Sequence, residues 1–89
     1  MTNPPSNRLF VKSNQGPIPK RDHLFSFFSH YGKIMDIFTP DRSPTIAYVE
    51  FEDQAVAENI VYNLKEVAVN GYTCLCDFAN RRTPLTKGA

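Results

Sequence analysis

Apolar and polar residues alternate with a period of two along four short stretches of the chain, and this alternation predicts β-strands. The four stretches are residues 8–12, 34–39, 45–51 and 73–78. The Asn70-Gly71 pair in front of the last stretch is a tight-turn signal, and it predicts a short hairpin-like piece that leads into that strand.

Two other stretches repeat apolar residues every three or four positions, which predicts helices. The first covers residues 20–31, and Gly32 is expected to end it as a C′ residue. The second follows Asp53, whose side chain is expected to cap the first turn. The core-facing positions are Leu24, Phe27 and Phe28 in the first helix and Ala57, Ile60, Val61 and Leu64 in the second.

The order of these elements is β-α-β-β-α-β, which predicts an α+β fold of the ferredoxin-like kind. In that fold a four-stranded antiparallel sheet carries both helices on one face, so the other face stays open. We expect one domain over residues 8–80, between a flexible leader at residues 1–7 and a flexible tail at residues 81–89.

The alternation also decides which side chains lie on the open face, because neighbouring residues of a strand point to opposite sides. Phe10 and Tyr48 fall opposite the apolar residues that must build the core. A one-residue slip in register would bury Phe10, but it would also expose Leu9 and Val11. The face is expected to carry Phe10, Phe38, Ile46, Tyr48 and Leu75, with Arg8, Lys12, Glu50 and Asp77 around them.

The orientation of the second strand depends on its one charged residue, Asp36. We expect Asp36 to point toward solvent, and Phe38, two positions on, then points to the same side. Met35 and Ile37 are expected to point inward, unless a bulge shifts the register.

Three segments carry the signatures of a known family. Residues 44–51 line up with the signature K/R-G-F/Y-G/A-F-V-x-F/Y. Leu9-Phe10-Val11 lines up with the partner signature, an aromatic residue between two aliphatic ones, and residues 24–34 are similar to the family's first helix and its exit. Over about residues 8–80 the chain therefore resembles the RNA recognition motif family.

The chain departs from the family signature at two positions. Pro44 stands where the family commonly has a phosphate-binding basic residue, and Ile46 stands where it commonly has a stacking aromatic residue. One of three expected rings and one charge contact are therefore absent. Ile46 and Leu75 also suit a strand by β-propensity alone.

The resemblance and the predicted open face both indicate a module that binds single-stranded RNA. An exposed patch of large apolar side chains is typical of a binding surface, and a base stacked on an aromatic ring contributes about 1–3 kcal/mol. We expect Phe10 and Tyr48 to stack two adjacent nucleotides. The predicted RNA-binding residues are Phe10, Tyr48, Lys12, Phe38, Ile46, Arg8, Leu75, Asp77, Asn80, Arg81 and Arg82.

The polar members of this set are expected to have two roles. Asp77 and Asn80 read the hydrogen-bonding edges of bases, whereas Lys12, Arg81 and Arg82 contact phosphates. A structural explanation stays open for three of them. Asp77 also suits a solubilising strand position, and the two arginines also suit an ordinary solvated tail.

A protein-interaction module on the same fold is the second interpretation. It would bind a peptide or another domain through the open sheet face, or through the first helix around Phe25, which lies off the core-facing side. We expect a monomer that belongs to a longer RNA-processing or mRNA-regulating protein, with RNA as its main partner and protein partners in addition.

Composition supports a small globular domain and limits the strength of RNA binding. The chain has 89 residues, of which 42% are apolar and 12% aromatic, and its net charge is +1. Few phosphates can be neutralised, so we expect micromolar affinity and a shallow salt dependence. No apolar run reaches the length of a membrane span. We expect an intracellular protein and favour the nucleus over the cytoplasm.

The residue types needed for metal binding or catalysis are not arranged to support either. Cys74 and Cys76 are expected to be a reduced, buried pair, because side chains two apart on a strand do not suit a disulfide. Two cysteines with only His23 and His30 far upstream lack the spacing of zinc ligands, so no metal or other cofactor is expected. Without a Gly-rich phosphate loop or a catalytic pair, we expect no enzymatic activity.

Overall fold

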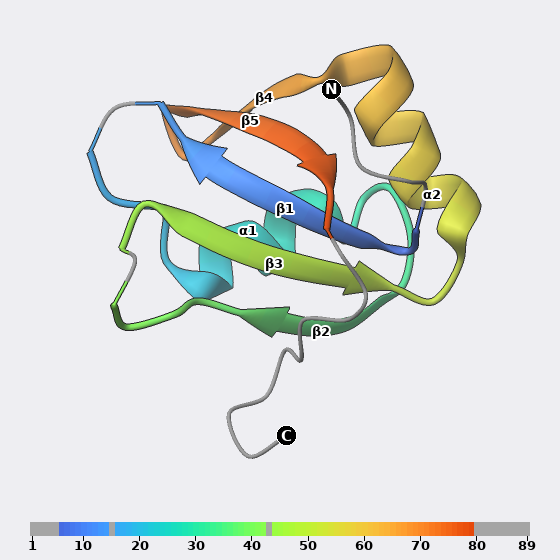
Figure 1. Cartoon of the computed structure of the whole chain (residues 1–89), viewed down its shortest axis with the longest axis horizontal. Coiled ribbons are helices and arrows are strands. Elements are labelled where there is room, and N and C mark those ends of the chain that lie inside the picture. The colour runs from blue at the N-terminus through green and yellow to red at the C-terminus, as the bar shows by residue number, and fades with distance from the viewer. Residues whose placement is uncertain (1–5, 15, 43, 80–89) are drawn as a thin grey trace.

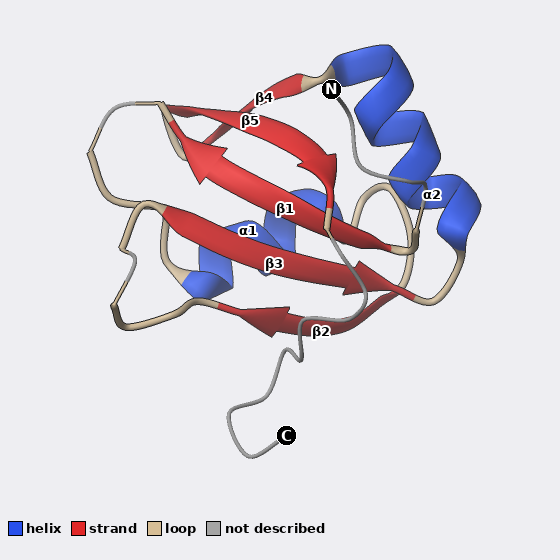
Figure 2. Ribbon diagram, in the orientation of Figure 1, coloured by secondary structure: helices blue, strands red, loops and turns tan. Residues whose placement is uncertain are grey.

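The computed structural model describes residues 6–14, 16–42 and 44–79. Within these residues the elements are β1 (Arg8–Ser13), α1 (Arg21–Phe28), β2 (Ile34–Phe38), β3 (Ile46–Phe51), α2 (Gln54–Asn59), η1 (Ile60–Leu64), β4 (Glu66–Val69) and β5 (Tyr72–Phe78). The strands form one antiparallel sheet in the order β2-β3-β1-β5-β4 (Figure 1). Figure 2 shows this sheet facing the viewer, with α1 behind it and α2 at its side.

The sheet in the described residues has one strand more than the four that the sequence predicts. The hairpin-like piece ahead of the last strand is a full strand, β4, which pairs with β5 across the turn at Asn70 and Gly71. These two residues have positive φ angles of 51° and 85°, as a two-residue type I′ turn requires. The predicted α+β fold, with helices on one side of an antiparallel sheet, is confirmed apart from this strand count.

The core lies between the sheet and the helices, and alternate residues of the central strands build it. These strands bury Leu9, Val11, Ala47, Val49, Phe51, Cys74, Cys76 and Phe78. The helices cover them with Leu24, Phe28, Ala57, Ile60 and Val61. The predicted inward sides of β1, β3 and β5 are therefore confirmed.

The edge strand β2 follows the predicted alternation over only part of its length. Its pairing with β3 shifts register between Ile34 and Asp36, which is a β-bulge at Met35. Met35 is consequently 56% exposed, and the prediction that it points inward is wrong. Beyond the bulge the alternation resumes, so Ile37 is buried and Phe38 pairs with the open-face position of β3, as predicted.

Gly32 has a different role from the one that its place after the helix suggests. α1 ends at Phe28 with Ser29 as its C-cap, rather than at Tyr31. Gly32 does not have a positive φ, so it is not the left-handed C′ residue that we expected. A Cβ atom at Gly32 would lie 2.5 Å from Cγ2 of Val56 in α2, so the glycine allows the loop to approach that helix closely.

The second helix begins as predicted and ends differently. The Asp53 carboxylate accepts a hydrogen bond from the Ala55 amide at 3.0 Å, which confirms the predicted N-cap. The last turn widens into η1, a π-helical segment, whose final bond runs from the Lys65 amide to the Ile60 carbonyl at 2.9 Å. This widening rotates Leu64 to 38% exposure, so its predicted place in the core is wrong. No helix in the described ranges is both long and apolar enough to cross a membrane.

Candidate functional site

Three aromatic side chains form a row across β2, β3 and β1 on the face opposite the helices. Phe38, Tyr48 and Phe10 occupy directly paired positions of these neighbouring strands. The ring centroid of Tyr48 lies 5.7 Å from that of Phe10 and 6.4 Å from that of Phe38. The Phe38 and Tyr48 rings are nearly parallel at 21°, whereas Phe10 is tilted by 54° from Tyr48. We call these three residues the aromatic row.

The neighbouring position along the strands extends the apolar surface. Lys12 pairs with Ile46 on one side and with Leu75 on the other, so these three residues form a second line beside the aromatic row. Leu75 is 41% exposed, Lys12 is exposed and Ile46 is half-buried. The structure therefore brings together the five apolar residues that the sequence places on the open face.

The charged residues on the other flank of the aromatic row form ion pairs. The Arg8 guanidinium lies 3.8 Å from the Glu50 carboxylate, and the Arg8 side chain is only 11% exposed. The Arg21 guanidinium likewise lies 3.9 Å from the Asp36 carboxylate. Arg8 is therefore not the free surface cation that its strand position suggested. The pairing with Glu50 could have been found from the sequence, because the two residues share the open-face side of adjacent strands.

Asp77 lies next to Phe10 on β5 and is held by the backbone. Phe10 and Asp77 are direct partners across β1 and β5. The Phe78 amide donates a hydrogen bond to Asp77 Oδ1 at 2.7 Å, which fixes the carboxylate at the surface of the sheet. The other predicted polar residues at this end, Asn80, Arg81 and Arg82, lie outside the described residues.

The two thiols belong to the core rather than to the site. Cys74 and Cys76 are both buried and free. Burial raises the pKa of both thiols, and for Cys76, where the neighbouring Cys74 adds to the effect, the pKa rises to about 12. A thiol of that kind stays protonated at neutral pH, whereas the reactive form of cysteine is the thiolate. The described residues contain no group of three or more His, Cys, Asp or Glu placed to hold a metal ion.

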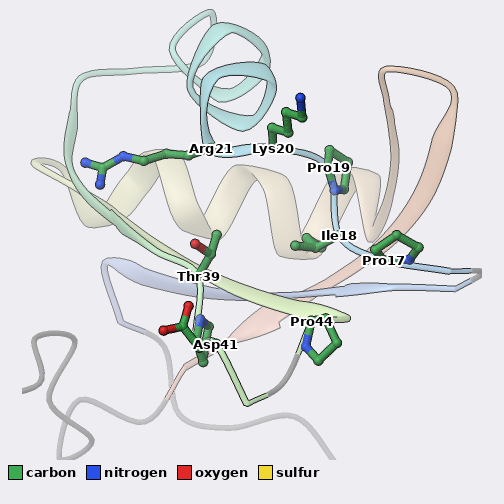
Figure 3. Close-up of a pocket in the computed structure, with 9 residues that line it drawn as sticks. Pro17, Ile18, Pro19, Lys20, Arg21, Thr39, Asp41 and Pro44 are labelled. Carbon is green, nitrogen blue, oxygen red and sulfur yellow. The ribbon is translucent and has the colours of Figure 1, made fainter.

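A shallow pocket of about 400 Å³ lies at the end of the sheet where β2 leads into β3 (Figure 3). It is lined by Pro17, Ile18, Pro19, Lys20, Arg21, Thr39, Pro40, Asp41 and Pro44. Figure 3 shows the side chains of Lys20 and Arg21 extending away from Thr39 and Asp41. The lining of the pocket thus combines prolines with two cations, Lys20 and Arg21, and one carboxylate, Asp41.

The helix side of the molecule carries the surface that the alternative interpretation, protein binding, would use. Phe25 is 52% exposed on α1, as its position off the core-facing side predicts. A hollow of about 300 Å³ between α1 and the turn of β4 and β5 is lined by His23, Ser26, Phe27, His30, Val69 and Asn70. Phe25 does not line this hollow.

The fold thus places the aromatic row on an open sheet face rather than in a cleft. A family model described as the RNA recognition motif matches residues 9–75. The chain therefore belongs to the RNA recognition motif family, a family of RNA-binding domains, and the resemblance seen in the sequence is confirmed.

Proposed function

We propose that the domain binds a short stretch of single-stranded RNA on the aromatic row. The observation that carries this proposal is the uninterrupted line of three rings across β2, β3 and β1. Phe38 supplies a third ring next to Tyr48, which compensates for the isoleucine at the usual stacking position, Ile46.

The spacing of the rings favours single strands over duplexes. Adjacent ring centroids lie 5.7 Å and 6.4 Å apart, whereas successive nucleotides of one strand in a duplex are separated by about 3.4 Å along the axis. Bases on neighbouring rings must therefore be separated from one another. Unpaired RNA can separate its bases in this way without breaking base pairs.

The expected affinity follows from the number of rings and the shortage of cations. Stacking contributes about 1–3 kcal/mol per base, so three rings supply about 3–9 kcal/mol. A dissociation constant of 1 μM corresponds to about 8.2 kcal/mol. Among the described residues, Lys12 is the exposed cation beside the row and Arg8 is engaged with Glu50, so we expect these residues to add little binding energy through phosphate contacts. Micromolar binding by this domain alone is the expected result.

Binding of that strength suits a domain that works together with others, because a linked second module raises the effective concentration of its neighbour. We therefore propose that the domain functions within a longer RNA-processing or mRNA-regulating protein, in the nucleus, and that proteins as well as RNA contact it.

The test is a titration with pooled short RNAs, followed by amide chemical shifts and fluorescence anisotropy. Tyr48→Ala, which removes the ring that contacts both neighbours, is expected to weaken binding more than Phe10→Ala or Phe38→Ala. The loss should be about 5-fold to 150-fold, the equivalent of one stacked base. Phe25→Ala removes an exposed ring from α1 and is the matched control.

Equal affinity of the wild type and all three sheet variants would place the RNA site elsewhere. A loss in Phe25→Ala as large as the loss in Tyr48→Ala would instead point to α1. The amide signals of the aromatic row could also stay unchanged at millimolar RNA and shift when a protein partner is added. In that case the protein-interaction interpretation replaces the RNA-binding proposal.

A further inference from the structure

Three carboxylates lie close to the aromatic row, and they differ in their surroundings. Asp36 and Glu50 each face an arginine, Arg21 at 3.9 Å and Arg8 at 3.8 Å. Within the part of the chain that the structure describes, Asp77 has no cationic partner at ion-pair distance. Its one hydrogen bond there comes from the Phe78 amide.

Asp77 occupies the open-face position of β5 next to Phe10 of β1. Phe10 and Asp77 are direct partners in the antiparallel pairing of β1 and β5. Two positions further along the strands, the Ala79 amide donates a hydrogen bond to the Arg8 carbonyl at 2.8 Å, so Arg8 and Ala79 are a hydrogen-bonded pair. Since hydrogen-bonded pairs alternate, Phe10 and Asp77 are also a hydrogen-bonded pair, with Cα atoms about 5.5 Å apart. A base that is stacked on Phe10 and extends over β5 would therefore meet the Asp77 side chain.

The orientation of this carboxylate is set before any ligand arrives. The Phe78 amide occupies one side of Oδ1 at 2.7 Å. Oδ2 keeps its lone pairs for a ligand, because the described residues give it no hydrogen bond. A preorganised acceptor of this kind loses little conformational entropy when it binds.

We infer that Asp77 selects guanine at the position stacked on Phe10. An ionised carboxylate only accepts hydrogen bonds. Guanine presents two adjacent donors, N1–H and N2–H, whereas the amino groups of adenine and cytosine stand next to a ring nitrogen that is an acceptor. In uracil the single N3–H lies between two carbonyl oxygens, which the carboxylate repels. This inference rests on the proposed RNA-binding function and deepens it by naming the preferred base.

The experiment uses randomised tetranucleotides in which one position is fixed as guanine, adenine, cytosine or uracil. The fixed position that most shifts the Phe10 and Asp77 amides identifies the nucleotide on Phe10. At that position guanine is expected to bind about tenfold more tightly than uracil, which is a typical cost for one base mismatch. Inosine, which lacks the N2 amino group, should lose most of this advantage, whereas 7-deazaguanine should keep it.

Two variants separate Asp77 from general effects of charge. Asp77→Asn keeps the size of the side chain and should abolish the preference for guanine over uracil. Asp36→Asn is the matched control, because Asp36 also accepts a bond from the next amide in the chain, that of Ile37 at 2.9 Å, but does not lie beside Phe10. Asp36→Asn should retain the preference.

The outcomes distinguish the two proposals. If none of the pools binds, the RNA-binding proposal fails and the base preference fails with it. If the pools bind but do not discriminate, or if Asp77→Asn still prefers guanine, the selectivity inference is overturned and the RNA-binding proposal stands. The inosine comparison uses the wild-type protein, so an inosine oligonucleotide that binds as tightly as the guanine one overturns the inference even if the variants do not fold.

Discussion

Replacing Gly32 by alanine tests the close approach of the loop after α1 to the second helix. The new Cβ atom would lie 2.5 Å and 2.9 Å from the two γ-methyl carbons of Val56 and 3.2 Å from its Cβ. Rotating the valine does not remove the conflict, because its Cβ cannot move away without the helix. The φ angle of Gly32 lies outside the left-handed region, so the cost is one of space and not of backbone strain.

The expected change in the free energy of unfolding is the difference between two opposing effects. Inserting a carbon into a packed site costs about 1–3 kcal/mol. Exchange of glycine for alanine in an unstrained backbone returns about 0.4–1 kcal/mol, because the unfolded chain becomes less flexible. Gly32→Ala is therefore expected to lower the free energy of unfolding by about 1–2 kcal/mol. For a domain of this size the melting temperature would fall by about 4–8 °C per kcal/mol.

A double-mutant cycle with Val56→Ala is the decisive measurement. In that background the two closest methyl groups are absent, and only the contact at 3.2 Å remains. Gly32→Ala should then be neutral or slightly stabilising in urea denaturation, giving an interaction energy of about 1–2 kcal/mol between the two sites. An equal loss of stability in both backgrounds would show that Gly32 is not required for its contact with Val56.

Three further predictions follow from single features. Burial and the nearby Cys74 raise the pKa of Cys76 from 9.0 to about 12. The thiol therefore loses its proton at lower pH in the unfolded state than in the folded state. The free energy of unfolding should consequently fall by up to about 1.4 kcal/mol per pH unit between pH 9 and pH 12. Urea melts of Cys76→Ala over this range should lack that part of the slope, and an unchanged slope would contradict the assignment. Loss of the helix cap in Asp53→Ala should cost about 0.5–2 kcal/mol in the same assay, while Asp53→Asn, which can still accept the bond from Ala55, should cost less. RNA affinity measured at several salt concentrations should give a logarithmic slope no steeper than about −1.4, because each neutralised phosphate contributes about −0.7. A steeper slope would show that more cations than Lys12 and one neighbour contact the strand.

The sequence predicts the open face well because strict alternation leaves little freedom in β1, β3 and β5. Burying Leu9 and Val11 necessarily places Phe10 on the other side, and the same logic applies to Tyr48 between Ala47 and Val49. Pairing then brings the two rings together without any information about their side-chain rotamers. Predicting the contact of Phe38 with Tyr48 also requires the correct register of β2 beyond its bulge.

Two of the failures occur where a local irregularity breaks a regular period. The bulge in β2 inverts Met35, and the π-helical turn of η1 rotates Leu64 away from the core. Neither irregularity has a signal in the residue types, because each depends on how the segment meets the rest of the molecule. Gly32 shows the same limit. Its place after a helix suggests a cap, and only the packing against Val56 reveals that it is needed for space.

The acidic residues on the sheet face have a consequence for how the domain uses its binding energy. Stacking on Phe38, Tyr48 and Phe10 accepts any base, and phosphate contacts carry no sequence information. In a strongly basic domain these contributions would dominate binding. Among the described residues Arg8 is engaged with Glu50 and Asp77 has no cationic partner at ion-pair distance, so we expect few phosphate contacts and repulsion of any base edge that offers only acceptors. If Asp77 acts as inferred, Asp77→Asn should bind uracil-containing RNA more tightly than the wild type does, so that the variant gains affinity while it loses discrimination.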